Sequence, residues 1–392
     1  MSCFKSVPLC LFLYFVGVIQ AAPIMTTTTT TITTTNDSVE APSFTTRTIW
    51  TIIASSVFTL FACIYSAIHP NIPSPKDSPL LILWRRLGIM IVALIAPELI
   101  VTWAMRQWFS AHYTWTQEHS FFVLMGGFML YVDGKPYHTL QPDELLKLIR
   151  AGCIDAPTLT VKQIHDKSKG NAISKGLTIL QVVWFVVQLI TRAIYHLETT
   201  QLEVGTLAFA VLNFLTYAVW WNKPLGVQCP HPVYWKSTDV PENDQVAERG
   251  ILFPVCRSIE ELIGSPQALT PLSRKLRVPT FDGSIEIEAS NLLVLLLVGF
   301  LMVTIFGGIH CMAWFFTFPT YEEQVLWRMS AAAITLTPLF GFLTLLLSGF
   351  PVYAVLYAAG RAILLVLMFT TLRNLPPDAY KAVSWTSLVP HL

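Results

Sequence analysis

The sequence predicts an all-α protein, a polytopic bundle of seven to eight transmembrane helices with short helical elements in its loops. Only 12% of its 392 residues are charged, whereas soluble globular proteins carry about 25%. The mean hydropathy is +0.56, and several stretches of about 20 residues are apolar enough to cross a bilayer. The net charge of +1 does not indicate binding to nucleic acid. The apolar composition makes the lipid bilayer the expected partner.

The first residues have the layout of a secretory signal peptide, with an early Lys, an apolar stretch and then small residues. Cleavage is expected after Ala21, although the bulky Ile19 leaves an uncleaved signal anchor open. A Thr-rich segment follows that is too polar to bury a core, and it contains a glycosylation sequon at Asn36. The predicted division is a signal peptide at 1–21, a disordered lumenal segment at 22–46, and a membrane domain at 47–392 with polar loops at 133–175 and 223–291.

Seven segments are long and apolar enough to span a membrane. They are Thr48–Ile68, Leu87–Met105, Gly176–His196, Leu202–Trp221, Leu292–Trp314, Met329–Gly349 and Val352–Leu372. An eighth segment, Phe121–Val132, is too short for a straight spanning helix. It can cross if Trp115–Ser120 extends it, or it can be re-entrant or interfacial.

Loop charge bears on the orientation. The loops 133–175 and 223–291 each hold seven basic residues, and the positive-inside rule favours both in the cytoplasm. With a lumenal N-terminus this requires Phe121–Val132 to cross, which gives eight spans and a lumenal C-terminus. If it does not cross, there are seven spans and both loops are lumenal. Eight is the favoured number, in a multi-pass protein of the secretory pathway or plasma membrane.

The first polar loop is expected to fold in part. Residues 140–152 (LQPDELLKLIRAG) predict an amphipathic helix, with Asp143 and Glu144 near its start and Gly152 after its end. A second short helix is expected to start near Thr160. The basic run 166–170 (DKSKG) can grip phosphate, but it lacks the P-loop pattern, and contact with acidic lipid headgroups is favoured.

Ionisable groups inside a span are costly, which makes them candidates for function. Glu98 is the strongest candidate, because it lies near the middle of its segment beside Pro97, which frees a backbone carbonyl. It can accept a proton, bind a cation or pair with a buried arginine. The structural alternative is an ion pair with Arg192 or Arg361.

Arg361 lies near the middle of the last span after Ala-Ala-Gly, where small residues let helices approach closely. It can hold an anionic group such as a phosphate or carboxylate, or it can pair with an acid. Arg192 and Glu203 lie nearer span ends, where their charged groups are expected to reach the interface.

His310 and Cys311 fall in the last turns of Leu292–Trp314, near the surface. His310 can act as an acid or base or bind a metal, or it can be a satisfied polar residue at a helix end. Adjacent side chains point about 100° apart on a helix, so the two do not easily share one metal. Cys229-Pro230-His231 is a second loose pair. The sequence therefore predicts no metal site and no cofactor.

Several stretches together resemble a widespread family of fungal polytopic membrane proteins of unestablished function. They are APELIVTWAMRQW (96–108), GGF (126–128), the DKSKG region with SKGLTILQVVWFVVQLITR (174–192), LEVGTLAFAVLNFLTYAVWWNKPLGV (202–227), IHCMAWFFTFPTYEEQVLWR (309–328) and WTSLVPHL (385–392). The resemblance runs from about residue 80 to the C-terminus. It implies a fungal source and a membrane location, and it transfers no catalytic residue.

Three functions remain open. The leading hypothesis is a membrane-embedded enzyme that acts on a hydrophobic small molecule or lipid, in fungal secondary metabolism, with Glu98, His310 and Arg361 as catalytic candidates. The first alternative is a transporter or channel for a small molecule, because Pro97 and Pro338 break helices as carriers do near their sites. The second alternative is a receptor-like or scaffold protein.

Overall fold

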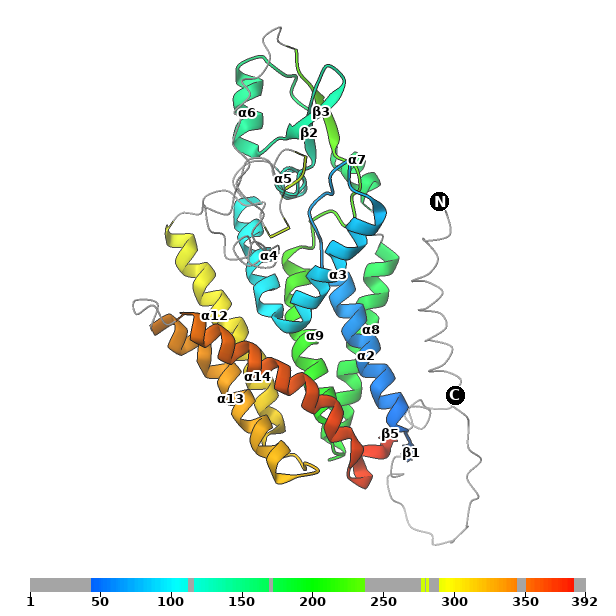
Figure 1. Ribbon diagram of the computed structural model, residues 1–392. Coiled ribbons are helices and arrows are strands. Elements are labelled where there is room, and N and C mark those ends of the chain that lie inside the picture. The colour runs from blue at the N-terminus through cyan, green and yellow to red at the C-terminus, as the bar shows by residue number, and fades with distance from the viewer. Residues whose placement is uncertain are drawn as a thin grey trace, which may run out of the picture.

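The computed structural model describes residues 44–111, 116–168, 172–236, 276–278, 280–281, 289–343 and 350–383. The predicted signal peptide, most of the Thr-rich segment, Asn36 and most of the second polar loop lie outside these residues. Within them the chain is mostly helical, as predicted. A bundle of long helices carries a smaller cap of short helices and strands at one end (Figure 1).

Six long helices form the bundle. They are α2 (Ile49–Ala67), α8 (Ala172–Ile194), α9 (Gln201–Val219), α12 (Ala289–Cys311), α13 (Tyr321–Leu343) and α14 (Phe350–Thr370). All of these except α13 are long and apolar enough to cross a membrane, which makes five spans in the described chain, or six if the bent pair α3–α4 is one span. Large apolar side chains such as Trp50, Leu297 and Val355 lie on their outer faces. These helices indicate a multi-pass membrane protein, and the predicted seven to eight spans are too many.

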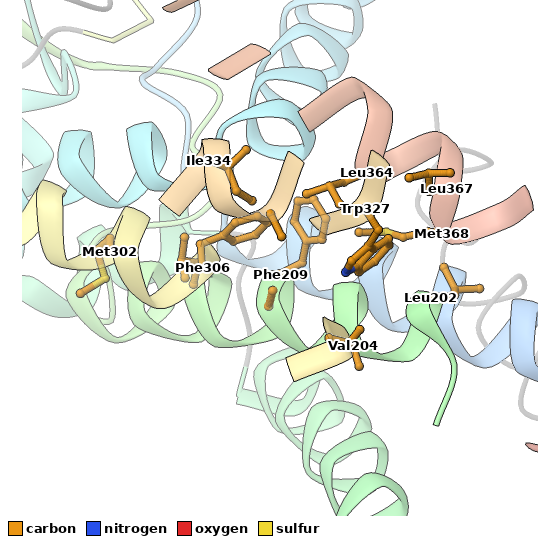
Figure 2. Packing of buried hydrophobic residues seen from close by; sticks show 14 of the residues in the cluster. Leu202, Val204, Phe209, Met302, Phe306, Trp327, Ile334, Leu364, Leu367 and Met368 are labelled. Carbon is orange, nitrogen blue, oxygen red and sulfur yellow. The ribbon is translucent and has the colours of Figure 1, made fainter. Parts of the chain in front are cut away.

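Helix α9 lies at the centre of the bundle, where it packs against α2, α4, α12 and α14. It is buried on nearly every side, as a helix that is apolar all round must be. Figure 2 shows Phe209 of α9 beside Phe306 of α12, with Trp327 and Leu364 close by. Aromatic rings from three helices therefore fill the middle of the core.

As a single continuous helix, the predicted span Leu87–Met105 is wrong, because a bend of 112° divides it into α3 (Pro79–Ile95) and α4 (Pro97–Ala111). Pro97 disfavours helical geometry at the residue before it, and Ala96 accordingly leaves the helical region at φ −145° and ψ 71°. The end of α4 comes back to the segment that leads from α2 into α3, since the Gln107 amide donates to Asn71 Oδ1 at 3.4 Å. The pair is therefore a hairpin that enters and leaves the bundle at the same end.

The predicted crossing by Phe121–Val132 is also wrong. This stretch forms the end of α5 (Gln117–Leu124) and then strand β2 (Phe128–Val132). Gly126 separates them at φ +87°, a conformation that glycine adopts without steric cost. Strand β2 pairs antiparallel with β3 (Lys135–Thr139) and parallel with β4 (His231–Tyr234). The pairing of β2 with β4 brings both polar loops to the cap end of the bundle.

The two short helices predicted in the first polar loop are confirmed. Helix α6 (Pro142–Arg150) is followed by Gly152 at φ +71°. Helix α7 (Val161–Lys167) starts from Thr160, which forms a capping box with Gln163.

At the end of the bundle opposite the cap, β1 (Phe44–Thr46) pairs antiparallel with β5 (Lys381–Val383) (Figure 1). The chain approaches β5 through the short 3-10 helices η4 (Thr371–Arg373) and η5 (Pro377–Tyr380). Because the two strands are hydrogen-bonded, both ends of the described chain lie at the same end of the bundle.

The prediction that Arg192 and Glu203 reach the interface is wrong, because both side chains are buried beside this small sheet. Arg47 forms two hydrogen bonds to the Glu203 carboxylate, at 2.5 and 3.1 Å. Arg192 donates to backbone carbonyls, including that of Lys381 at 2.6 Å and that of Glu198. Both charges therefore tie helix ends to the terminal strands.

Candidate functional site

The break between α3 and α4 places Glu98 in the first turn of α4, inside the bundle. Its side chain is buried, and Tyr357 of α14 donates a hydrogen bond to Glu98 Oε1 at 2.6 Å. Oxygen Oε2 is buried and has no hydrogen-bond partner among the described residues. Half of this carboxyl group is therefore free to bind a proton or a ligand.

Arg361 lies one turn after Tyr357 on α14 and is also buried. Its Nε donates to the carbonyl of Ile95 at 2.7 Å, and Nη2 lies 3.4 Å from the carbonyl of Leu94. These carbonyls belong to the last turn of α3, where a helix leaves its acceptors unpaired. The guanidinium also lies over the Phe306 ring, 3.7 Å from the ring centroid. Arg361 thus caps the first half of the hairpin.

Glu98 and Arg361 interact electrostatically. Within the described chain, however, they form no ion pair. The guanidinium instead donates its hydrogen bonds to the carbonyls at the end of α3. The alternative of a simple Glu–Arg pair is therefore not what is observed. The arginine charge is held close to the acid while the acid keeps one oxygen open.

His310 lies in the last turn of α12, as predicted, and its side chain is fully buried inside the protein. Its Nδ1 is 2.8 Å from the Phe306 carbonyl, and its ring packs on the Phe306 ring at 4.5 Å. Nε2 is buried and has no hydrogen-bond partner among the described residues. Trp327 Nε1 donates to the His310 carbonyl at 3.2 Å, which ties α13 to the end of α12.

The three residues selected from the sequence thus gather around one aromatic cluster. Arg361 and His310 both contact Phe306, and the charge of Arg361 acts on both Glu98 and His310. Sequence reasoning missed Tyr357 and the α3 carbonyls. The four-residue spacing of Tyr357 and Arg361 places them on one face of α14, and this was the available signal.

The described residues contain no group of three His, Cys, Asp or Glu side chains that could hold a metal ion. The four cysteines among them, Cys63, Cys153, Cys229 and Cys311, are free thiols. A groove of about 310 Å³ lies between α8 and α9, but Val, Ala, Phe and Leu side chains alone line it. This groove offers no chemical group, so the candidate site rests on the hairpin.

A second buried basic side chain lies at the outer end of the same hairpin. Lys223, just after α9, is 1% exposed, and its Nζ donates to Gln107 Oε1 at 2.8 Å. The rings of Trp220 and Trp103 lie 4.3 and 4.9 Å from Nζ. Sequence reasoning missed this lysine, because it follows an apolar run and looks like an interfacial residue.

A family model matches residues 12–114 and 110–263, which is more than half of the chain. The chain belongs to this family of unknown function, DUF8562. The match includes the hairpin with Glu98 and also Lys223, whereas His310, Tyr357 and Arg361 lie beyond it. No curated protein and no solved structure matches the chain. The family description names neither a source nor an activity, so a fungal origin stays a prediction.

Proposed function

We propose that this protein is a transporter that carries a small molecule across the membrane, with the α3–α4 hairpin facing the route. Broken helices build the substrate and coupling-ion sites of many transporters. Non-helical backbone at membrane depth is tolerated where it is buried in protein or lines a cavity. The observation that carries the proposal is the unpartnered Oε2 of Glu98 at the break of this hairpin.

The roles follow from the contacts. Glu98 takes up a proton or a cationic group through Oε2, while Tyr357 fixes Oε1. Arg361 keeps its charge at any physiological pH, and its bonds to the carbonyls of Ile95 and Leu94 hold the first half of the hairpin in place. The buried His310 offers a second open nitrogen beside the same aromatic cluster.

The transport proposal includes a topology of six crossings. The hairpin does not cross, and α13, which packs between α12 and α14, supplies the sixth crossing. An even number agrees with the pairing of β1 with β5. Positive loop charge then puts the cap in the cytoplasm and residues 22–46 outside, after removal of a signal peptide at 1–21. Enzymatic removal of N-linked sugar should shift the gel mobility of the protein, and Asn36→Gln should abolish this shift.

The first experiment compares small molecules in cells and in medium for a strain that lacks the gene. The strain is complemented with the wild type, with Glu98→Gln, or with Glu322→Gln, which changes an exposed acid in the first turn of α13. A transporter predicts a compound whose distribution between cells and medium is restored by the wild type and by Glu322→Gln but not by Glu98→Gln. An unchanged distribution of every compound would count against transport.

An enzyme is the second candidate. Glu98 Oε2 and His310 Nε2 are both buried and open, which suits an acid–base pair acting on a hydrophobic small molecule or lipid. In the same profiling experiment an enzyme predicts a product missing from both fractions together with an accumulated precursor. A product that is made but confined to one fraction supports the transporter instead.

A further inference from the structure

Lys223 joins the end of α4 and the segment between α2 and α3 to the end of α9. Its Nζ donates to Gln107 Oε1 at 2.8 Å and lies 3.5 Å from Asn71 Oδ1. Gln107 is near the end of α4, and Asn71 lies in the segment that leads from α2 into α3. Lys223 therefore helps to close the base of the hairpin, and moving Gln107 away from Asn71 and α9 breaks its hydrogen bond.

The surroundings of Lys223 are nearly dry, and no carboxylate of the described residues pairs with it. The amine is enclosed by the rings of Trp220 and Trp103, which pack edge to face at 4.7 Å, and the ring of Phe281 packs against Trp103 at 5.3 Å. Burial lowers the pKa of Lys223 well below its ordinary value, because the charged form loses its water.

The titratable neighbours come from two elements. His69, in the segment after α2, packs on the Trp220 ring at 5.7 Å, and Tyr217 of α9 packs on His69 at 6.2 Å. Helix α4 contributes the uncharged Trp103 and Gln107. The pH range of the test below is therefore chosen between the ordinary pKa values of His and Tyr side chains, which are about 6.5 and 10.

We propose that Lys223 is a proton-binding site that couples opening of the hairpin to pH. In the closed state a neutral amine donates to Gln107 and needs no counter-ion. In the open state the amine meets water and takes up one proton. The ligand is thus the proton itself. Opening of the hairpin takes up one proton, and closing releases it.

The coupling has a defined size. Between the lowered pKa of the closed state and the ordinary lysine pKa of about 10.4, each pH unit changes the ratio of open to closed hairpin by up to about tenfold. Acidification favours the open state. This does not depend on which compound the protein carries, so it can hold even if the transport proposal fails.

Hydrogen exchange measured by mass spectrometry on the full chain in lipid nanodiscs tests this coupling. Base-catalysed amide exchange becomes faster in proportion to the hydroxide concentration. The population of the open hairpin falls in the same proportion, because opening takes up a proton. Between about pH 7.5 and 9.5, the amides around Gln107 and in residues 68–78 should therefore exchange at a nearly constant rate. Helix α6 in the cap, where no residue bonds to Lys223, should show the ordinary rise.

Two substitutions sharpen the test. Lys223→Met keeps the apolar stem without a titratable group, so exchange around Gln107 should regain the ordinary rise with pH. Lys223→Arg keeps a permanent charge and should leave the base open throughout the range. Lys236→Met, at a half-exposed lysine of the cap, is the matched control and should behave as the wild type.

Two results would overturn the proposal. One is exchange around Gln107 that rises with pH in the wild type as steeply as it does in α6. The other is a Lys223→Met protein whose exchange profile is the same as that of the wild type. The first comparison uses only the unaltered protein, so it decides the question even if neither variant folds.

Discussion

The tip and the base of the α3–α4 hairpin are each held by a buried basic side chain, and the two side chains differ in kind. At the tip, the guanidinium of Arg361 binds the carbonyls of Ile95 and Leu94. At the base, the amine of Lys223 binds the side-chain oxygens of Gln107 and Asn71. Both basic groups lie over aromatic rings, and neither forms an ion pair within the described residues.

The difference between a guanidinium and an amine indicates which end of the hairpin can move. A guanidinium cannot lose its proton in a protein, and the backbone carbonyls that it binds are permanent acceptors. An amine loses its proton readily when it is buried. The tip is therefore a fixed attachment and the base a releasable one, with Glu98 next to the fixed end.

Removing the fixed attachment should have the largest effect on stability. Arg361→Met leaves the last carbonyls of α3 unpaired and removes the charge near Glu98, which should cost about 3 kcal/mol or more. The midpoint of thermal unfolding in nanodiscs measures this cost. Arg328→Met is the matched control, because Arg328 also binds a carbonyl, that of Trp314, but is only partly buried. Equal costs for the two substitutions would contradict a special role for the tip.

The second effect concerns the base and its pH dependence. Lys223→Arg should cost about 2 kcal/mol, since it forces a permanent charge and extra volume into a dry site, whereas Lys223→Met should cost less. Because the folded-state pKa of Lys223 is lowered, the unfolded chain binds more protons than the folded protein. The wild type should therefore gain stability over Lys223→Met as pH rises toward about 10.4. Unfolding midpoints across this range check the sign, and a loss of stability with rising pH would contradict it.

A smaller effect is expected at the hydroxyl that fixes Glu98. Tyr357→Phe removes one hydrogen bond and leaves both Glu98 oxygens without a partner, which should cost about 1 kcal/mol. The same unfolding assay measures it. If Tyr357→Phe cost as much as Arg361→Met, then the hydroxyl, not the guanidinium, would be the main attachment at the tip.

The smallest effect on stability is expected for Glu98→Gln, because an amide oxygen still accepts from Tyr357. We expect a change below about 0.5 kcal/mol, together with loss of the biological activity seen in metabolite profiling. A stable protein without activity would assign Glu98 to function. A strongly destabilised one would assign it to structure and remove the support for the proposed role.

The sequence by itself determined that the protein is helical and built for a membrane, because apolar composition over about 20 residues is a local property. It also selected Glu98, Arg361 and His310, since the cost of burying a charge can be inferred without knowing its partners. It located α6 and α7 from their local cap signals.

The two errors in the predicted spans share one origin. Hydropathy cannot distinguish a helix that crosses from one that turns back at Ala96, or from a buried helix and strand divided at Gly126. The strand pairings nevertheless put the polar loops and Phe44 at opposite ends of the bundle (Figure 1).

Only the tertiary structure decided which groups meet. Tyr357 and the carbonyl of Ile95 are 262 residues apart in number but share a neighbour, Arg361, because α14 packs against the hairpin. In the sequence Lys223 looks like an interfacial residue. The residues that bury it include Trp103 and Gln107, which belong to another helix and are not visible from the local sequence. The local sequence pattern shows which environment each segment can tolerate. The bonding partners of a side chain depend on contacts between segments that are distant in the chain, and no local signal encodes those contacts.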